Sequence, residues 1–292
     1  MGQVARKAVK TEKIPLLPTL LTTGNLVCGV IAIILAIYDS FKLILPPPGS
    51  SQHVFIPYVT SCYLILLAMV FDVLDGMAAR LTNTAGKFGI EYDSLSDVVS
   101  FGVAPAILMY VVVLRYQGPV GIALASIFIF AGAFRLARFN VLTNSGAGDP
   151  RIFKGLPIPA AASVLVSYVI FSQWFDVYYA TGPRLFYDKA LDWYSENITT
   201  FQHYVIPALM ILLAVLMISN VKFSSFKYFL VRERIRFAVL AGSMCALFIL
   251  FVKFEVSAFL LCTGYVLWNL IKAGYELLKA RRQKLKRRKQ NV

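Results

Sequence analysis

Long apolar runs separated by short polar segments are the dominant pattern along this chain. Each run approaches the roughly 17–25 residues with which an α-helix crosses the hydrocarbon core of a bilayer. Eight runs can be marked, at residues 16–38, 55–79, 95–114, 119–134, 156–175, 204–220, 237–252 and 256–273. The pattern predicts an all-α fold, a polytopic membrane helical bundle with about eight transmembrane helices.

The composition also favours a membrane protein. Of the 292 residues, 58% are hydrophobic and 15% are charged, whereas soluble domains are about 45–50% apolar and about 25% charged. These values exclude a disordered chain and an ordinary soluble enzyme. The four cysteines are dispersed in apolar runs, without CxxC spacing or a Cys/His cluster. Neither a disulfide framework nor a zinc site is indicated.

The distribution of charge predicts the orientation. The chain has 29 Lys and Arg against 15 Asp and Glu, a formal charge of +14. In a membrane protein such an excess marks cytoplasmic loops and contact with anionic membrane lipids, and no nucleic acid partner is expected. With both termini and every second loop in the cytoplasm, 24 of the 29 cations lie inside. This asymmetry predicts cytoplasmic termini and a long outside loop at 176–203.

Carboxylates are sparse in the apolar runs, yet four aspartates lie within residues 72–97. Positions spaced i, i+3, i+4, i+7 and i+8 share one helical face. The first such face contains Asp72, Asp75, Gly76, Ala79 and Arg80, and the next helix aligns Gly89, Asp93 and Asp97. Because the link between the two helices is short, we expect them to lie antiparallel and to bring the four carboxylates to the cytoplasmic edge of the bundle.

Four neighbouring carboxylates repel one another in a low-dielectric site unless a cation neutralises them. Oxygen ligands without His or Cys favour a hard divalent cation such as Mg²⁺ or Mn²⁺. The small residues on the same faces leave room for a bulky anion, and Arg80 is placed to hold a phosphate oxygen. The set therefore predicts a diphosphate site, although helix capping or a salt bridge to Arg80 explains any single aspartate equally well.

The pattern D-x2-D-G-x2-A-R-x8-G-x3-D-x3-D resembles the motif of the CDP-alcohol phosphotransferases at every position. The resemblance implies an integral membrane enzyme, usually a homodimer, which transfers a phosphoalcohol from a CDP-linked donor to an acceptor hydroxyl and releases CMP. It also implies a six-helix catalytic core. The corresponding division of the chain is a basic segment at 1–15, the core at 16–220, two additional helices at 221–278 and a basic tail at 279–292.

Further stretches look like the phosphatidylserine synthase branch of this family, at residues 17–26, 93–105, 135–140 and 155–160. That likeness implies CDP-diacylglycerol as donor and L-serine as acceptor. It implies that Asp72, Asp75 and Asp93 ligate one or two Mg²⁺ or Mn²⁺ ions. Asp97 is then the general base and a further candidate ligand of the second metal.

The remaining candidates divide between the two substrates. Donor-binding candidates are Thr22, Asn25, Asp72, Gly76, Ala79, Arg80 and Gly89; for Thr22 and Asn25, hydrogen bonding between helices is an equal alternative. Acceptor-binding candidates are Arg135, Arg138, Asn140 and Lys154, where paired arginines suit the carboxylate of serine. Positive-inside anchoring is the alternative interpretation of these arginines.

Two other functions stay open. The same chemistry with glycerol 3-phosphate or an inositol phosphate as acceptor would need a denser cationic pocket, which Arg135, Arg138, Arg151 and Lys154 are able to supply. A cation transporter is the alternative from a different class, since intramembrane carboxylates also line ion paths. A transporter would place carboxylates at several depths, whereas here they gather at one edge.

Overall fold

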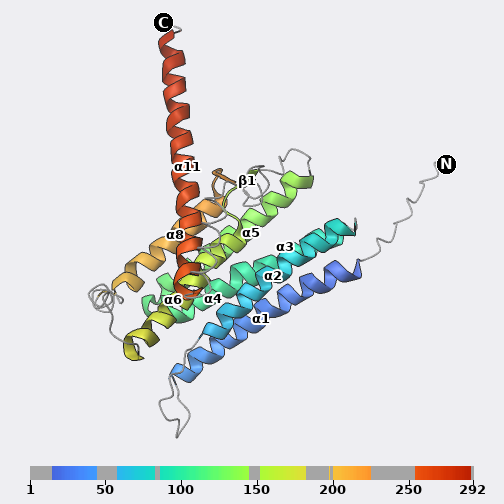
Figure 1. The fold of residues 1–292 in the computed structure, drawn as a ribbon, viewed down its shortest axis with the longest axis vertical. Helices are drawn as coiled ribbons and strands as arrows, with labels where there is room; N and C mark the ends of the chain where they lie inside the picture. Colours follow the sequence, from blue (N-terminus) through green and yellow to red (C-terminus); the bar gives the residue numbers. More distant parts are fainter. Residues whose placement is uncertain are drawn as a thin grey trace, which may run out of the picture.

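The computed structural model describes residues 15–44, 58–82, 86–144, 152–181, 197, 200–224 and 254–290 (Figure 1). Its main helices are α1 (Leu16–Ile44), α2 (Val59–Leu81), α3 (Lys87–Asp97), α4 (Ala104–Val112), α5 (Pro119–Asn144), α6 (Ile158–Thr181), α8 (Ile206–Ile218) and α11 (Phe254–Gln290). Short helical segments are η1 (Val98–Val103), η2 (Leu114–Gln117) and η3 (Phe201–Val205). Two three-residue strands, β1 (Ile152–Lys154) and β2 (Lys222–Ser224), pair antiparallel.

The prediction of an all-α, polytopic membrane protein is confirmed. Seven helices of the described part of the chain are long and apolar enough to cross a membrane. Their spans are Leu16–Lys42, Val59–Leu81, Phe88–Val112, Pro119–Leu142, Ile158–Val177, Phe201–Ile218 and Phe254–Lys272. The predicted span 237–252 and most of the predicted outside loop lie outside the described residues, and the division into domains stays a prediction.

The third span begins earlier than its apolar run suggested, at Phe88 instead of residue 95. α3, η1 and α4 follow one another without a break, so the polar helix that carries two of the aspartates is the start of the span. The π-helical segment η1 ends just before Pro105. Since proline has no N–H and its ring clashes with the preceding turn, a widened turn at this place accommodates it.

The helices pack around one shared core. α1 packs along α2 and also contacts α3, η1 and α4, while α5 packs on α8 and α11 on α6. The core contains Phe101, Leu108, Phe128, Leu165 and Tyr168, all fully buried. Many large apolar side chains on the outer faces are exposed, such as those of α1 and α2, as expected for surfaces that face lipid.

The functional candidates gather at one end of the bundle. Figure 1 shows that the start of α1, the end of α2 and the start of α3 lie at the same end, which we call the polar end. The end of α5 and the β1–β2 pair lie there as well. α11 projects well past the other helices, and the predicted boundary between residues 278 and 279 falls inside this helix.

Candidate active site

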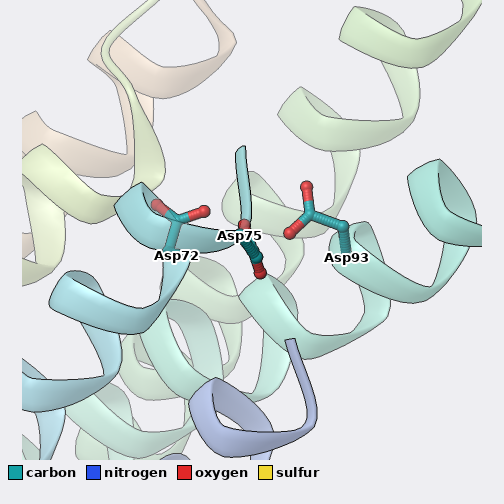
Figure 2. Close-up of side chains that lie close together, drawn as sticks. All are labelled: Asp72, Asp75 and Asp93. Atoms are coloured by element: carbon teal, nitrogen blue, oxygen red, sulfur yellow. The ribbon is translucent and has the colours of Figure 1, made fainter. Parts of the chain in front are cut away.

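Three aspartates converge between α2 and α3. Asp72 and Asp75 lie one helical turn apart on α2, and Asp93 faces them from α3 (Figure 2). One carboxylate oxygen from each residue lies within 4.8 Å of the other two. The antiparallel helix pair thus brings together three of the four carboxylates that the sequence spacing placed at one edge.

The oxygens of this cluster suit a divalent cation. Asp75 Oδ2 and Asp93 Oδ1 are buried and have no hydrogen-bond partner within the described part of the chain. Buried carboxylate oxygens without partners cost free energy, which a bound cation offsets. An all-oxygen donor set fits Mg²⁺ or Mn²⁺. The cluster is therefore able to hold a metal ion, and Asp72, Asp75 and Asp93 are the residues that would ligate it.

Asp97 lies one helical turn beyond Asp93, at the junction of α3 and η1. Its side chain is 7% exposed, and its Oδ1 accepts a hydrogen bond from Asn25 Nδ2 of α1 at 3.3 Å. Asp97 is not part of the three-carboxylate group. The structure thus separates the fourth aspartate from the other three.

A pocket opens beside the cluster, between the start of α1, the end of α2 and the start of α3. Its lining includes Asp75 and Asp93 together with the donor candidates Thr22, Gly76, Ala79 and Gly89. A Cβ added to Gly89 would meet no atom within 4 Å, and one added to Gly76 would meet only the Arg80 guanidinium, at 3.8 Å. The missing side chains therefore leave open space for a ligand against the backbone.

The other donor candidates occupy different environments. Arg80 is exposed at the end of α2, where its Nε donates to the Gly76 carbonyl at 2.7 Å. Thr22 Oγ1 donates to the Pro18 carbonyl at 3.0 Å. Asn25 is fully buried and does not line the pocket. The structure thus places Thr22 in the pocket lining and Asn25 deeper in the bundle, against Asp97, whereas Arg80 is not one of the lining residues.

The acceptor candidates separate into two groups. Arg135 of α5 is 8% exposed and interacts electrostatically with Asp97 and Asp72, and its guanidinium lies 5.7 Å from the ring centre of Phe139. Asn140 Nδ2 donates to Ser94 Oγ at 2.9 Å, which links α5 to α3. These two residues therefore face the helix that carries Asp93 and Asp97.

Arg138 points toward α8 instead. Its Nη1 donates to the Ile218 carbonyl at 3.0 Å, and its Nη2 donates to Asn220 Oδ1. Lys154 lies in β1 opposite Lys222, and its side chain is outside the described part of the structure, as is Arg151. The structure does not bring Arg138 together with Arg135.

The apolar pattern did not predict how the polar end is held together. Gly155 follows β1 with φ 87° and donates its N–H to the Val221 carbonyl at 2.8 Å. Two buried serines, Ser96 and Ser100, donate to backbone carbonyls of α1. Ser100 is a polar residue in the apolar second part of the third span, and Ser96 lies one turn before it. This spacing of four residues is the signal that would have found them, since it places both on one face.

Comparison with known proteins shows the family to which this chain belongs. The family model for CDP-alcohol phosphatidyltransferase matches residues 15–195. The chain is 39% identical over 170 residues to a CDP-diacylglycerol–serine O-phosphatidyltransferase of Helicobacter pylori, covering 58% of this chain and 62% of that protein. It is 35% identical over 214 residues to the protein of the same name in Methanocaldococcus jannaschii, covering 73% and 84%.

An archaetidylserine synthase of Methanothermobacter thermautotrophicus is 36% identical over 209 residues, covering 71% of this chain and 69% of that protein. The match spans less than two thirds of the length of the Helicobacter pylori relative, 62%. The family model covers more than half of this chain and includes all four aspartates. The resemblance predicted from the spaced aspartates is therefore confirmed, and the chain belongs to the CDP-alcohol phosphatidyltransferase family.

Proposed function

We propose that this protein is a membrane phospholipid synthase that transfers the phosphatidyl group of CDP-diacylglycerol to the hydroxyl of L-serine. The products are phosphatidylserine and CMP. The observation that carries the proposal is the convergence of Asp72, Asp75 and Asp93 beside a glycine-lined pocket at the polar end. The choice of donor and acceptor is supported by the names of the Helicobacter pylori and Methanocaldococcus jannaschii relatives.

On the donor side, Asp72, Asp75 and Asp93 would hold one or two Mg²⁺ or Mn²⁺ ions. Such ions, when bound, neutralise a diphosphate and the charge that develops on the departing CMP. Gly76, Ala79 and Gly89 leave the backbone open to the diphosphate. Thr22, in the pocket lining, and Arg80, one helical turn beyond Gly76, bind its outer oxygens or the nucleotide.

On the acceptor side, Asp97 takes the proton of the serine hydroxyl as that oxygen attacks the phosphorus. A new P–O bond forms to serine, and the P–O bond to CMP breaks. Arg135, buried beside Asp97 and Asp72, binds the carboxylate of serine. Asn140 and Lys154 are the further residues that bind the acceptor. Arg138 acts indirectly, because its hydrogen bond to the Ile218 carbonyl holds the end of α8.

The placement of Arg138 bears on the alternative acceptors. A phosphorylated acceptor such as glycerol 3-phosphate or an inositol phosphate brings about two negative charges and needs several cations around it. The guanidinium of Arg138 is already engaged by Ile218 and Asn220. A pocket with fewer available cations favours a single carboxylate, and hence serine.

The experiment that tests the function is acceptor-dependent CMP release by the purified protein with CDP-diacylglycerol and Mn²⁺. We expect release with L-serine and none with glycerol 3-phosphate or an inositol phosphate. An Asp93→Asn protein serves as the inactive control. Release with a phosphorylated acceptor alone would establish the alternative acceptor, and no release with any of the three would contradict the proposed activity.

The proposal includes sidedness and assembly: the active site and both termini face the cytoplasm, and the protein is a homodimer. In a background without the four native cysteines, Ser195→Cys should react with an impermeant thiol reagent in intact cells, and Gln290→Cys should not. The opposite labelling would place the site on the outer face. The mass of the protein in detergent, corrected for bound lipid, distinguishes a dimer from a monomer.

A further inference from the structure

A polar seam joins α1 to the helix that carries Asp93 and Asp97. Ser96 Oγ donates to the Thr22 carbonyl at 3.2 Å, and Ser100 Oγ donates to the Asn25 carbonyl at 3.0 Å. Both serines are fully buried. These hydrogen bonds run between two helices, although α-helical carbonyls are ordinarily bonded within their own helix. The seam therefore fixes how α1 lies against α3 and η1.

The two helices approach each other as closely as their backbones allow at one point of this seam. A Cβ added to Gly29 would lie 2.3 Å from Ser100 Oγ and 2.8 Å from Ser100 Cα. Only a residue without a side chain fits at this contact, as is common where membrane helices approach closely. Ser100 is thereby held between Gly29 and the Asn25 carbonyl.

Asp97 immediately precedes the π-helical segment that contains Ser100. A π-helical turn is wider than an α-helical turn and interrupts the regular hydrogen-bond ladder, so it is a point at which a helix is able to shift. The anchoring of Ser100 against α1 removes this freedom. The backbone that carries Asp97 is thus held from its C-terminal side.

The side chain of Asp97 is held from α1 as well. Asn25 is fully buried, and its Nδ2 donates to Asp97 Oδ1 at 3.3 Å. Burying an amide in an apolar bundle costs free energy unless its hydrogen bonds are made, and Asn25 Oδ1 makes none in the described structure. The one side-chain hydrogen bond of Asn25 in the described structure thus goes to Asp97. This favours a role in orienting the Asp97 carboxylate over a general role in helix association.

We propose that Asn25 is a positioning residue for Asp97, kept in place by Ser100 and Gly29. The inference rests on the proposed function, in which Asp97 is the general base. With Oδ1 held by the amide, the carboxylate presents its other oxygen to the acceptor hydroxyl. Asn25 then belongs to the acceptor chemistry and not to the binding of the donor, which was one of the two roles that the sequence left open for it.

The test measures the kinetics of the full-length protein carrying Asn25→Leu, which keeps the branched shape of the side chain and removes the amide. We expect kcat to fall about 10- to 100-fold, on the scale that is typical of removing a hydrogen-bond partner that orients a metal ligand. The KM for CDP-diacylglycerol and the affinity for Mn²⁺, measured by electron paramagnetic resonance, should stay at the wild-type values. Ser100→Ala should lower kcat less, because it removes only the backbone tether.

Ser172→Ala is the matched control. Ser172 is also buried, but its hydroxyl donates within its own helix, to the Val169 carbonyl, far from the polar end. We expect its kcat to equal that of the wild type. If Asn25→Leu does not fold, Ser100→Ala carries the same comparison, with the thermal stability of both serine variants measured alongside.

A double mutant separates positioning from any general effect on the fold. In an Asp97→Asn background, Asn25→Leu should cause no further loss, because its effect passes through Asp97. An equal loss in both backgrounds, an unchanged kcat, or a rise in donor KM alone would overturn the positioning role. Retained activity in Asp97→Asn by itself would instead contradict the proposed general base, so the two failures are distinguishable.

Discussion

Two neighbouring regions at the polar end use charge in opposite ways. In the aspartate cluster between α2 and α3, Asp75 and Asp93 each have a buried carboxylate oxygen without a hydrogen-bond partner in the described structure. In the contact between α5 and α8, the guanidinium of Arg138 is bonded to the Ile218 carbonyl and to Asn220. The first region has unmet bonding capacity, and the second is satisfied by the protein itself.

This difference in hydrogen bonding distinguishes residues that bind ligands from residues that stabilise the fold. Buried polar groups in folded proteins are nearly always hydrogen-bonded, so an exception calls for an explanation such as a bound ion. The contrast is sharpest between Arg135 and Arg138, which lie three residues apart on α5. Arg135 is buried toward Asp72 and Asp97, whereas Arg138 holds the end of α8.

The largest expected effect comes from emptying the aspartate cluster of metal. Chelation with EDTA should abolish CMP release, and adding Mg²⁺ or Mn²⁺ should restore it. Asp72→Asn, Asp75→Asn and Asp93→Asn should each lower kcat by more than about 100-fold, because metal-based charge stabilisation amounts to several kcal/mol. The measurement is the initial rate of CMP release with both substrates saturating.

The matched control for these variants is Asp176→Asn. Asp176 is an exposed carboxylate near the end of α6 and is not part of the cluster. We expect this variant to keep wild-type activity and metal dependence. Full activity of the wild type in excess EDTA would show that the unpaired oxygens of the cluster do not bind a metal ion needed for the reaction.

The next effect concerns the buried arginine. Arg135→Lys keeps the charge but loses the planar fork that holds a carboxylate through two hydrogen bonds. Losing one charge-assisted contact costs about 1.5–3 kcal/mol, so we expect the KM for serine to rise roughly 10- to 150-fold. Varying each substrate separately checks this result. If the donor KM rises and the serine KM does not, Arg135 belongs to the nucleotide side.

The local parts of this architecture were predictable from the sequence, and the long-range parts were not. Helical periodicity relates residues three or four apart, so it placed Asp72 and Asp75 on one face of a helix. The convergence with Asp93 required only a short link between antiparallel helices. The start of the third span was misplaced because its first turns carry polar residues that face the site, which shortens the apolar run.

The partners of Arg138 and of Asn25 lie 80 and 72 residues away along the chain. No periodicity connects such positions, so the two arginines looked equivalent, and for Asn25 a donor contact and a hydrogen bond between helices were equal alternatives. Only the packing of α5 on α8 and of α1 on η1 distinguishes them. The sequence therefore predicts which residues are polar within an apolar bundle, and tertiary packing decides which of them remain available to a ligand.

A smaller effect tests the open side of the aspartate region. Gly89→Ala adds a methyl group where no protein atom lies within 4 Å. The fold should gain about 0.5–1 kcal/mol, since alanine favours helix over glycine. If the donor occupies this space, its KM should rise at least about fivefold through steric overlap. Substrate titration and thermal unfolding measure the two quantities on the same protein.

Gly264→Ala is the control for that variant. Gly264 lies in α11, and a Cβ there also meets no atom within 4 Å. It should produce a similar gain in stability with no change in either KM. An unchanged donor KM in Gly89→Ala would show that the open space beside Asp93 is not used by the donor.

The smallest effect is expected at the contact between α5 and α8, where Arg138 is hydrogen-bonded. It decides whether Arg135 and Arg138 have different roles. Arg138→Gln removes the charge and at least one of the two hydrogen bonds to the end of α8. Hydrogen bonds of this kind contribute about 0.5–1.5 kcal/mol net, so the Tm should fall by roughly 2–5 °C. The KM for serine should change far less than in Arg135→Lys, because α8, and not the acceptor, receives this guanidinium. A large rise in serine KM with an unchanged Tm would show that Arg138 leaves α8 when the substrate binds. Arg138 would then be a ligand-binding residue, and not a structural one.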